Sequence, residues 1–215
     1  NNKQSKLAET DVKKFDSPFP INFVAPQLRE AKVTTLSNGV RVLSETPSVP
    51  GLVTVGVLLE VGSQNETKET SGALLSIKAT QYKTNLNTNE TINYNMVQMT
   101  GGQYSMDYDR ERSIFKAQCL SHDVPDIVGM LSDCVLEPRS SVTVNAAISK
   151  MKHLHKLYEA KNPGQKSTEL AMSQIYGHQG LGMPLLGFEK NIDSLNAYTL
   201  QKFQIENFSP ERIIV

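Results

Sequence analysis

The chain has 215 residues, of which 39% are apolar and 20% are charged, and its 22 Lys plus Arg balance 22 Asp plus Glu. This composition is typical of a globular chain with one substantial core, and the zero net charge provides no overall field to attract nucleic acid or an anionic membrane. All apolar runs are much shorter than the roughly eighteen residues of a transmembrane helix, so no membrane span is predicted.

Prolines interrupt the beginning of the chain. Pro18, Pro20 and Pro26 lack the backbone N–H that a helix or a strand uses, and each also restricts the residue before it. We therefore predict that residues 1–30 form an extended arm. The remaining residues, 31–215, are numerous enough for a single domain with a sizeable core.

The first predicted strands form a hairpin. Residues 32–36 and 40–43 are rich in β-branched side chains and flank Ser37-Asn38-Gly39. The Asn-Gly step supplies the positive φ angles of a tight turn, so the two runs are predicted to pair. The next run, 52–61, is apolar or β-branched at almost every position and stops at Gly62. This pattern predicts a central strand that is covered on both faces.

Beyond this strand the pattern changes several times. The stretch 69–84, with the sequence ETSGALLSIKATQYKT, is predicted to begin a helix, and a polar, Asn-rich loop follows at 85–90. A short helix is expected to end at Gly101-Gly102. Two further strands, 103–109 and 113–119, are predicted to pair with each other.

The second half of the sequence is mainly helical. Apolar residues recur at helical spacing from Val124 to Val135, with Pro125 in the first turn and Pro138 just beyond the end. The same spacing and similar stop signals predict the remaining helices. They cover residues 148–158, 170–176 and about 197–206, and a final strand covers 212–215.

Strands come first, helices follow, and a strand returns at the end. This order predicts an α+β domain in which a mostly antiparallel sheet carries helices on one face. Ile213-Ile214-Val215 ends the sequence without a polar tail. We therefore expect that the chain continues, or once continued, into something else, and that a second domain is absent, on a separate chain or outside this sequence.

Few residues in the sequence indicate chemistry. Cys119 and Cys134 lie in a predicted strand and on the apolar face of a predicted helix, so two buried, reduced thiols are favoured over a disulfide or a reactive Cys. Gly180-Leu181-Gly182 lacks the following glycine and lysine of a phosphate-binding loop. Lys78 is predicted to be exposed or salt-bridged rather than buried and activated.

Four motifs occur in a characteristic order: KVTTLSNGVRVLSE (32–45), VTVGVLLEVGSQNET (53–67), DIVGMLSDCVLEP (126–138) and GLGMPLLGFEKNIDSL (180–195). Together they resemble the pitrilysin-type (M16) metallopeptidases, and within this family the α subunit of the mitochondrial processing peptidase and core protein 2 of the cytochrome bc1 complex. The resemblance covers nearly the whole chain and only the N-terminal one of the two domains that family members carry. It implies a LuxS/MPP-like metallohydrolase-type fold.

The resemblance also implies where a zinc site belongs. Active members hold zinc with His-x-x-Glu-His on the helix after the Gly-Ser turn, plus a distal Glu; the two His face the same way at i and i+4, and the intervening Glu activates a water. Counted from Ser71-Gly72, these positions are Leu75, Lys78 and Ala79. Leu and Ala have no lone pair and Lys brings a positive charge, so no catalytic residue, metal or cofactor is expected.

The distal ligand falls in the region 154–159, where His155 and Glu159 are the residues able to bind a metal. They lie four residues apart on one helix face, but two ligands without a helix partner do not make a catalytic site. A surface or inter-subunit ion pair is therefore favoured over a relic or regrown metal site. His153 points away from His155 on a helix, so these two do not form a chelate.

The first functional hypothesis is a non-catalytic core subunit of a mitochondrial inner-membrane assembly, most simply respiratory complex III (ubiquinol-cytochrome c reductase) on its matrix side. The resemblance implies a zinc-bearing β-type partner, homologous to core protein 1 and the processing-peptidase β subunit, and contacts with other complex III subunits. It also implies a role in holding mitochondrial presequence peptides. On this hypothesis the chain is a pseudoenzyme of the electron-transport chain.

Two alternatives stay open at this stage. The second hypothesis is a repurposed single-domain accessory subunit of another mitochondrial respiratory assembly, kept for its surfaces. The end of the sequence at Val215 favours this hypothesis. The third hypothesis is an active zinc peptidase with a displaced metal site. The missing His-x-x-Glu-His pattern disfavours this third hypothesis.

Overall fold

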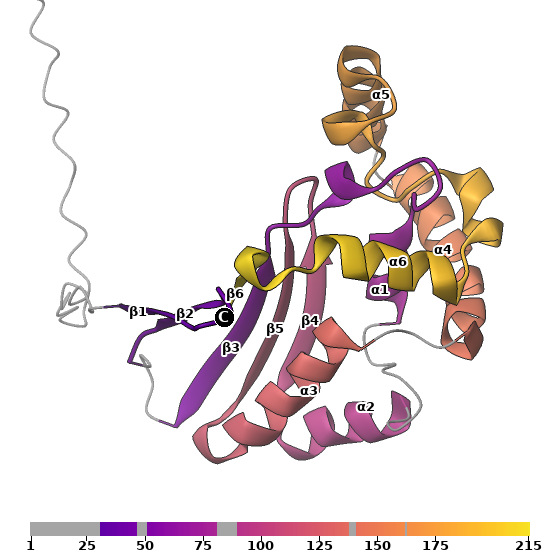
Figure 1. Cartoon of the computed structure of the whole chain (residues 1–215). Helices are drawn as coiled ribbons and strands as arrows, with labels where there is room; N and C mark the ends of the chain where they lie inside the picture. The colour runs from indigo at the N-terminus through magenta and orange to yellow at the C-terminus, as the bar shows by residue number, and fades with distance from the viewer. Residues whose placement is uncertain (1–30, 47–50, 81–89, 138–140, 162) are drawn as a thin grey trace, which may run out of the picture. The chain divides into compact units, whose positions relative to one another are not determined.

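A six-stranded sheet with helices packed on one side is the framework of the computed structural model, which describes residues 31–46, 51–80, 90–137, 141–161 and 163–215 (Figure 1). The predicted arm at 1–30 and nearly all of the predicted loop at 85–90 lie outside the described residues. The sheet order is β1-β2-β6-β3-β5-β4. The strands are β1 (Lys32–Thr35), β2 (Arg41–Ser44), β3 (Leu52–Leu59), β4 (Gln103–Tyr108), β5 (Ser113–Leu120) and β6 (Ile213–Ile214).

The strand pairing confirms the predicted antiparallel character of the sheet. β1 and β2 form the predicted hairpin, with Thr35 opposite Arg41 and a left-handed Gly39 in the turn, at a φ of 93°. β5 lies between β3 and β4 and pairs antiparallel with both, and β3 also pairs antiparallel with β6. The one parallel pair among the described strands joins β2 to β6. β6 therefore brings the last described residues into the middle of the sheet, where Val215 N donates to Arg41 O at 2.8 Å.

The prediction that the run 52–61 is covered on both faces is wrong. In β3 the buried residues Val57 and Leu59 face the helices, whereas Leu52 and Thr54 are exposed. β5 alternates more regularly, with Ser113, Phe115, Ala117 and Cys119 buried and most of the intervening residues exposed. Apolar, β-branched composition shows that a segment suits a strand, but only the arrangement of helices decides whether its second face is covered.

Six α-helices are described, and they confirm the predicted helices, with two of them beginning earlier than expected. They are α1 (Ala73–Ala79), α2 (Glu90–Met99), α3 (Val124–Leu136), α4 (Ser141–Lys161), α5 (Pro163–Tyr176) and α6 (Ala197–Asn207). Short 3-10 helices cover Ser63–Asn65, Ser121–Asp123, Gly180–Gly182, Glu189–Ser194 and Pro210–Arg212. Within the described ranges, no helix combines the length and the apolar character needed to cross a membrane.

α3 illustrates how the sequence specifies these helices. Pro125 lies in its first turn, where the missing N–H costs nothing, and apolar residues at helical spacing give it one buried face. That face packs against β5 and β3. Cys134 on α3 and Cys119 on β5 are both buried and no disulfide joins them, in agreement with the prediction of two buried thiols.

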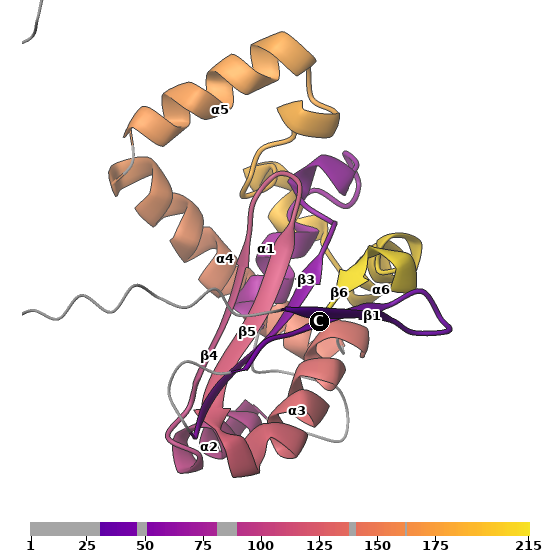
Figure 2. The same cartoon turned by 90° about the vertical axis from the view of Figure 1, so that its left-hand side faces the viewer.

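The positions of α1, α4 and α5 relative to the sheet are visible in two views at right angles. α1 lies between the sheet and α4, and α5 projects beyond the end of the β4–β5 hairpin (Figures 1 and 2). α5 has no buried residue among those described, whereas α1 has six. α1 is therefore the helix through which the sheet and α4 are connected.

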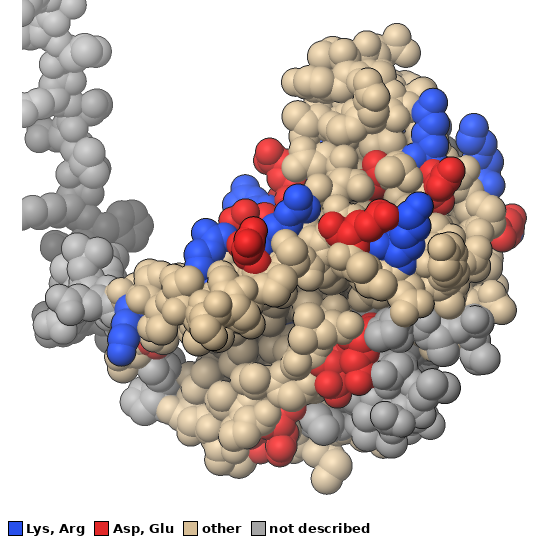
Figure 3. Space-filling view, in the orientation of Figure 1, with Lys and Arg blue, Asp and Glu red and all other residues tan. Residues whose placement is uncertain are grey.

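Charged side chains of both signs lie side by side across the middle of the face drawn in Figure 3. This face carries no large patch of basic side chains alone. The mixture of charges on this face (Figure 3) agrees with the equal numbers of acidic and basic residues in the sequence.

Phe115 is one of the two phenylalanines that are fully buried in the main core, and it lies on β5 opposite Val57. Replacing Phe115 with Ala is expected to lower the free energy of unfolding by about 3–5 kcal/mol, because the change loses apolar burial and leaves a cavity. Urea denaturation measures the change. Val33→Ala, at a side chain that is 64% exposed, is the control and is expected to change stability by less than about 0.5 kcal/mol.

Candidate functional site

α1 is buried on two sides. Leu74 and Ile77 belong to the main core between sheet and helices, whereas Leu75 and Ala79 belong to a second cluster that includes Ala147 and Met151 of α4, with Ile192 and Leu195. Lys78 is the exception, because its side chain is 40% exposed. A seven-residue helix has little stability of its own, so packing on both sides must hold it.

The structure places Leu75, Lys78 and Ala79 on the part of α1 that meets α4 and β4. The Lys78 ammonium forms an ion pair with Asp107 of β4 at 2.8 Å and lies 5.8 Å from the centre of the Tyr108 ring. The prediction that Lys78 is exposed or salt-bridged is therefore confirmed. Exposed pairs of this kind contribute about 0–1 kcal/mol to stability.

The residues on α1 do not fit a zinc ion. Leu75 and Ala79 carry no atom that ligates a metal, and the Lys78 ammonium repels a cation. Among the described side chains, no three His, Cys, Asp or Glu residues come together as a metal site would require. The assignment of these three positions as the equivalents of zinc ligands stays a prediction.

His155 is turned toward a backbone carbonyl. Its Nε2 lies 2.8 Å from the carbonyl oxygen of Leu186, so this contact ties α4 to the loop before Gly187. The Glu159 side chain lies outside the described residues, and the predicted His155–Glu159 ion pair stays a prediction. His153 is exposed on α4.

A cavity of about 310 Å³ opens beside Leu75 and Lys78. We call it the α1 cavity. Five leucines and two tyrosines surround it, and Lys78 supplies the only charged side chain among the described lining residues. Its lining consists of Leu75 and Lys78 of α1, Tyr108 of β4, Leu154, Leu157 and Tyr158 of α4, and Leu185 and Leu186 of the following loop.

A second cavity, of about 240 Å³, lies between α4, α5 and the loop 182–188, and we call it the α5 cavity. Tyr158, Leu185 and Leu186 line both cavities and therefore form the wall between them. The α5 cavity is also mainly apolar, with Leu170, Pro184 and Phe188 among its lining residues.

Glu66 is the buried acidic group beneath this site. It is 4% exposed, and its carboxyl oxygens accept hydrogen bonds from Gly72 N at 2.8 Å and from Leu74 N at 2.9 Å. Burial raises the pKa of Glu66 to about 8, against the lowering effect of these two backbone donors. The sequence analysis did not single out Glu66. The signal in the sequence was an acidic residue just upstream of a helix start, where the cap residue, Gly72, has no side chain to accept hydrogen bonds from the first N–H groups.

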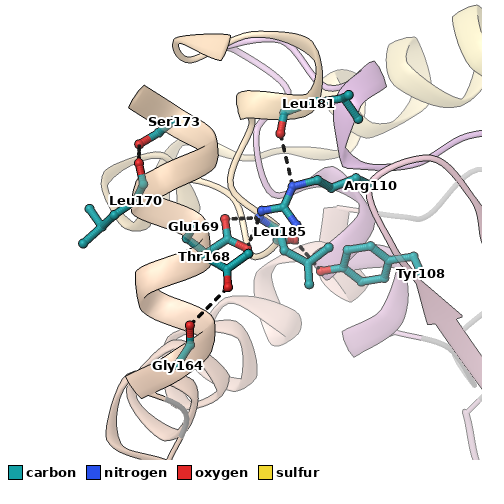
Figure 4. A network of polar contacts seen from close by, with 9 residues as sticks. All are labelled: Tyr108, Arg110, Gly164, Thr168, Glu169, Leu170, Ser173, Leu181 and Leu185. Atoms are coloured by element: carbon teal, nitrogen blue, oxygen red, sulfur yellow. Dashed lines mark hydrogen bonds and ion pairs between the residues drawn. The ribbon is translucent and has the colours of Figure 1, made fainter. Parts of the chain in front are cut away.

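A polar network joins the β4–β5 turn to α5 and the glycine-rich loop (Figure 4). Arg110 Nη2 pairs with Glu169 Oε1 at 2.8 Å, and Arg110 Nε donates to Leu181 O at 3.1 Å. The Tyr108 hydroxyl donates to Leu185 O at 2.9 Å, and Leu185 N donates to Glu169 Oε2 at 3.2 Å. The loop is thus held from both sides.

Tyr108 of this network and the neighbouring Tyr158 both have raised pKa values. Burial, together with the nearby charges of Glu66 and Glu169, raises the pKa of Tyr108 well above its usual value. Burial and the charge of Glu169 also raise the pKa of Tyr158, although Arg110 acts in the opposite direction. Neither Arg110 nor Glu169 stands out in the sequence, because the two are 59 positions apart.

Backbone packing fixes the loop against the start of α1. Gly187 has a φ of +71°, and a Cβ on it would lie 2.4 Å from Gly72 N. Phe188 N also donates to the Ser71 hydroxyl at 3.0 Å. A glycine is required at position 187 both for its conformation and for this close approach.

Comparison with known proteins identifies the family. The family model described as "Insulinase (Peptidase family M16)" matches residues 41–189. The chain therefore belongs to the insulinase family of peptidases, M16, which confirms the resemblance seen in the sequence motifs.

Individual relatives include subunits of both types of one enzyme. The chain is 30% identical to the mitochondrial-processing peptidase subunit alpha of Solanum tuberosum, over 94% of this chain and 39% of that protein. It is 28% identical to the subunit beta of Dictyostelium discoideum, over 98% of this chain and 46% of that protein. An uncharacterized zinc protease of Mycobacterium tuberculosis is 23% identical over 85% of this chain and 42% of that protein.

The fold is also that of a solved structure. A protease from Helicobacter pylori superposes with a TM-score of 0.78 at 17% identity, covering 87% of this chain and 45% of that one. This likeness confirms the predicted α+β fold. The chain spans less than half the length of these relatives.

Glu66 gives the stability of this region a pH dependence. The folded chain holds the Glu66 proton up to about pH 8, whereas the unfolded chain releases it near 4.5. This contribution to stability is therefore complete below pH 4.5 and is lost as the pH rises toward 8. Thermal unfolding between these limits is expected to show a smaller fall in stability for Glu66→Gln than for the unchanged chain. Equal pH slopes for the two proteins would contradict this assignment.

The Arg110–Glu169 pair is expected to stabilise the site measurably. Arg110→Met or Glu169→Gln should each lower the free energy of unfolding by about 1–3 kcal/mol, because both side chains are only 19% exposed and each leaves a partner unsatisfied. The double variant should lose less than the sum of the two losses. The exposed Arg41–Glu60 pair, at 2.6 Å, is the control, and its disruption should cost less than about 1 kcal/mol in the same urea titration.

Proposed function

We propose that this chain is a non-catalytic, α-type member of the M16 family that acts as a core subunit beside a catalytic partner. The observation that carries the proposal is the apolar contact between α1 and α4. Leu75 and Ala79 pack against Ala147 and Met151 at the positions where the sequence motifs align with metal ligands of active relatives. The relative named mitochondrial-processing peptidase subunit alpha, at 30% identity, supports an α-type role.

The physical reason for the lack of catalysis lies in the side chains of α1. A zinc site needs several lone-pair donors that converge on one point, and a nearby base to activate water. Here the α1–α4 contact is filled by carbon, and Lys78 is paired with Asp107. Filling this contact with apolar groups stabilises the domain through the same surface on which an active relative places its ligands.

The proposed partner is a β-type, zinc-bearing homologue of core protein 1 and the processing-peptidase β subunit. The names of the relatives support a mitochondrial setting and a paired arrangement of α and β subunits, and we infer a location on the matrix side. We place the assembly in respiratory complex III at the inner membrane, where the chain contributes structure and helps to hold presequence peptides. Any peptidase activity belongs to the assembly.

Purification from its native source under mild conditions tests this proposal. Recovery with a two-domain β-type homologue and with cytochrome b and cytochrome c1 subunits is the expected result. Recovery with an unrelated respiratory complex alone would sink the core-subunit proposal and favour a repurposed accessory subunit. Metal analysis of the purified chain is expected to find no stoichiometric zinc, and one zinc per chain would show an active peptidase with a displaced site.

Restoring the missing ligands tests the assignment of Leu75, Lys78 and Ala79. The variant carrying Leu75→His, Lys78→Glu and Ala79→His is expected to bind cobalt(II) with a visible absorption band, because two His at i and i+4 on α1 face α4 together. The new side chains are expected to cost about 1–3 kcal/mol through overpacking.

The control for this experiment is Lys78→Glu alone, which adds one carboxylate and no His. It is expected to bind no cobalt above the level of the unchanged chain. Circular dichroism checks that the triple variant is folded. A folded triple variant that also binds no cobalt would contradict the expectation that two His at positions 75 and 79 hold a metal ion.

A further inference from the structure

Most of the polar side chains around the α1 cavity already have a hydrogen-bond or ion-pair partner within the protein. Lys78 is paired with Asp107, and the Tyr108 hydroxyl donates to Leu185 O. Across the wall, His155 contacts Leu186 O. Two groups keep hydrogen-bonding capacity: the Lys78 ammonium, which uses one of its three N–H donors on Asp107, and Tyr158, whose side chain lines both cavities and whose hydroxyl has no hydrogen-bond partner within the described part of the chain.

This pattern distinguishes between classes of ligand. An extended peptide carries a donor and an acceptor at every residue and needs partners for those it buries. The α1 cavity has only three polar side chains in its described lining, Lys78, Tyr108 and Tyr158, so an extended peptide finds partners for few of its backbone groups. A hydrocarbon chain needs no partners, and burying it against leucine side chains is favourable by the hydrophobic effect.

We propose that the α1 cavity binds a straight aliphatic chain with a single polar head group, such as a medium-length fatty acid. The ligand's hydrocarbon chain would lie among Leu75, Leu154 and Leu157, and its head group would accept a hydrogen bond from the hydroxyl of Tyr158. The neighbouring α5 cavity, behind Tyr158 and the two leucines of the wall, provides room for a longer chain. This inference rests on the cavity itself and does not depend on the proposed partner.

Charge around the cavity is compatible with this ligand. Lys78 and Asp107 neutralise each other at the mouth, and Arg110 and Glu169 do so beside the wall. A carboxylate therefore meets no net negative field, and a neutral alcohol loses no essential partner. The Tyr158 hydroxyl can donate to either head group, since a tyrosine is protonated at neutral pH.

Titration of the whole 215-residue chain with decanoate, followed by calorimetry, tests the proposal. Saturable binding at one site, below the concentration at which decanoate forms micelles, is the expected result. Leu154→Trp places a larger side chain in the cavity and should abolish this binding. Ile205→Trp, at a side chain of α6 that is 74% exposed and lines a different surface, is the matched control and should bind as the unchanged chain does.

Tyr158→Phe tests the head-group contact separately. It should weaken decanoate binding about fivefold, as expected for one hydrogen bond, while leaving the cavity apolar. Should Leu154→Trp fail to fold, methyl NMR of the unchanged chain replaces it, and decanoate should shift the signals of Leu75, Leu154 and Leu157. Absence of saturable binding, equal binding by folded Leu154→Trp, or capture of an apolar decapeptide in place of decanoate would overturn the proposal.

Discussion

The burial of α1 on both sides is the constraint on which the rest of the site depends. A helix of seven residues cannot persist alone, so its position is set by the core on one side and by α4 on the other. Polar or charged groups on either buried face would need partners that the surroundings do not supply. With Leu75 and Ala79 on the α4 side, the contact closes through apolar packing.

Loops far apart in the sequence complete the site. Glu66 holds the start of α1 through two backbone N–H groups, and Gly187 brings the later loop against Gly72. Arg110 and Glu169 then tie that loop to the β4–β5 turn and α5. These contacts position the wall of Tyr158 and two leucines between the cavities, so the geometry of the pockets depends on the same residues as the stability of α1.

Membership of a peptidase family does not by itself decide whether this chain is catalytic. The match to peptidase family M16 and the fold shared with a protease are findings about ancestry and architecture. The proposed loss of catalysis concerns particular side chains, because a scaffold retains its packing when ligands are replaced by apolar residues. An apolar cavity lies beside α1, and it provides a basis for the proposed binding role that needs no metal.

The sequence alone determined the order of strands and helices, the hairpin at Asn38-Gly39, the family and the mainly apolar character of α1, because local spacing and residue type carry that information. It misjudged β3, whose outer face is open, because composition does not show where helices pack. Only the tertiary structure decided which residues meet: the Glu66 cap, the Arg110–Glu169 pair and the two cavities. These contacts join positions far apart in the chain, and no local pattern of residues records which distant partners folding will bring together.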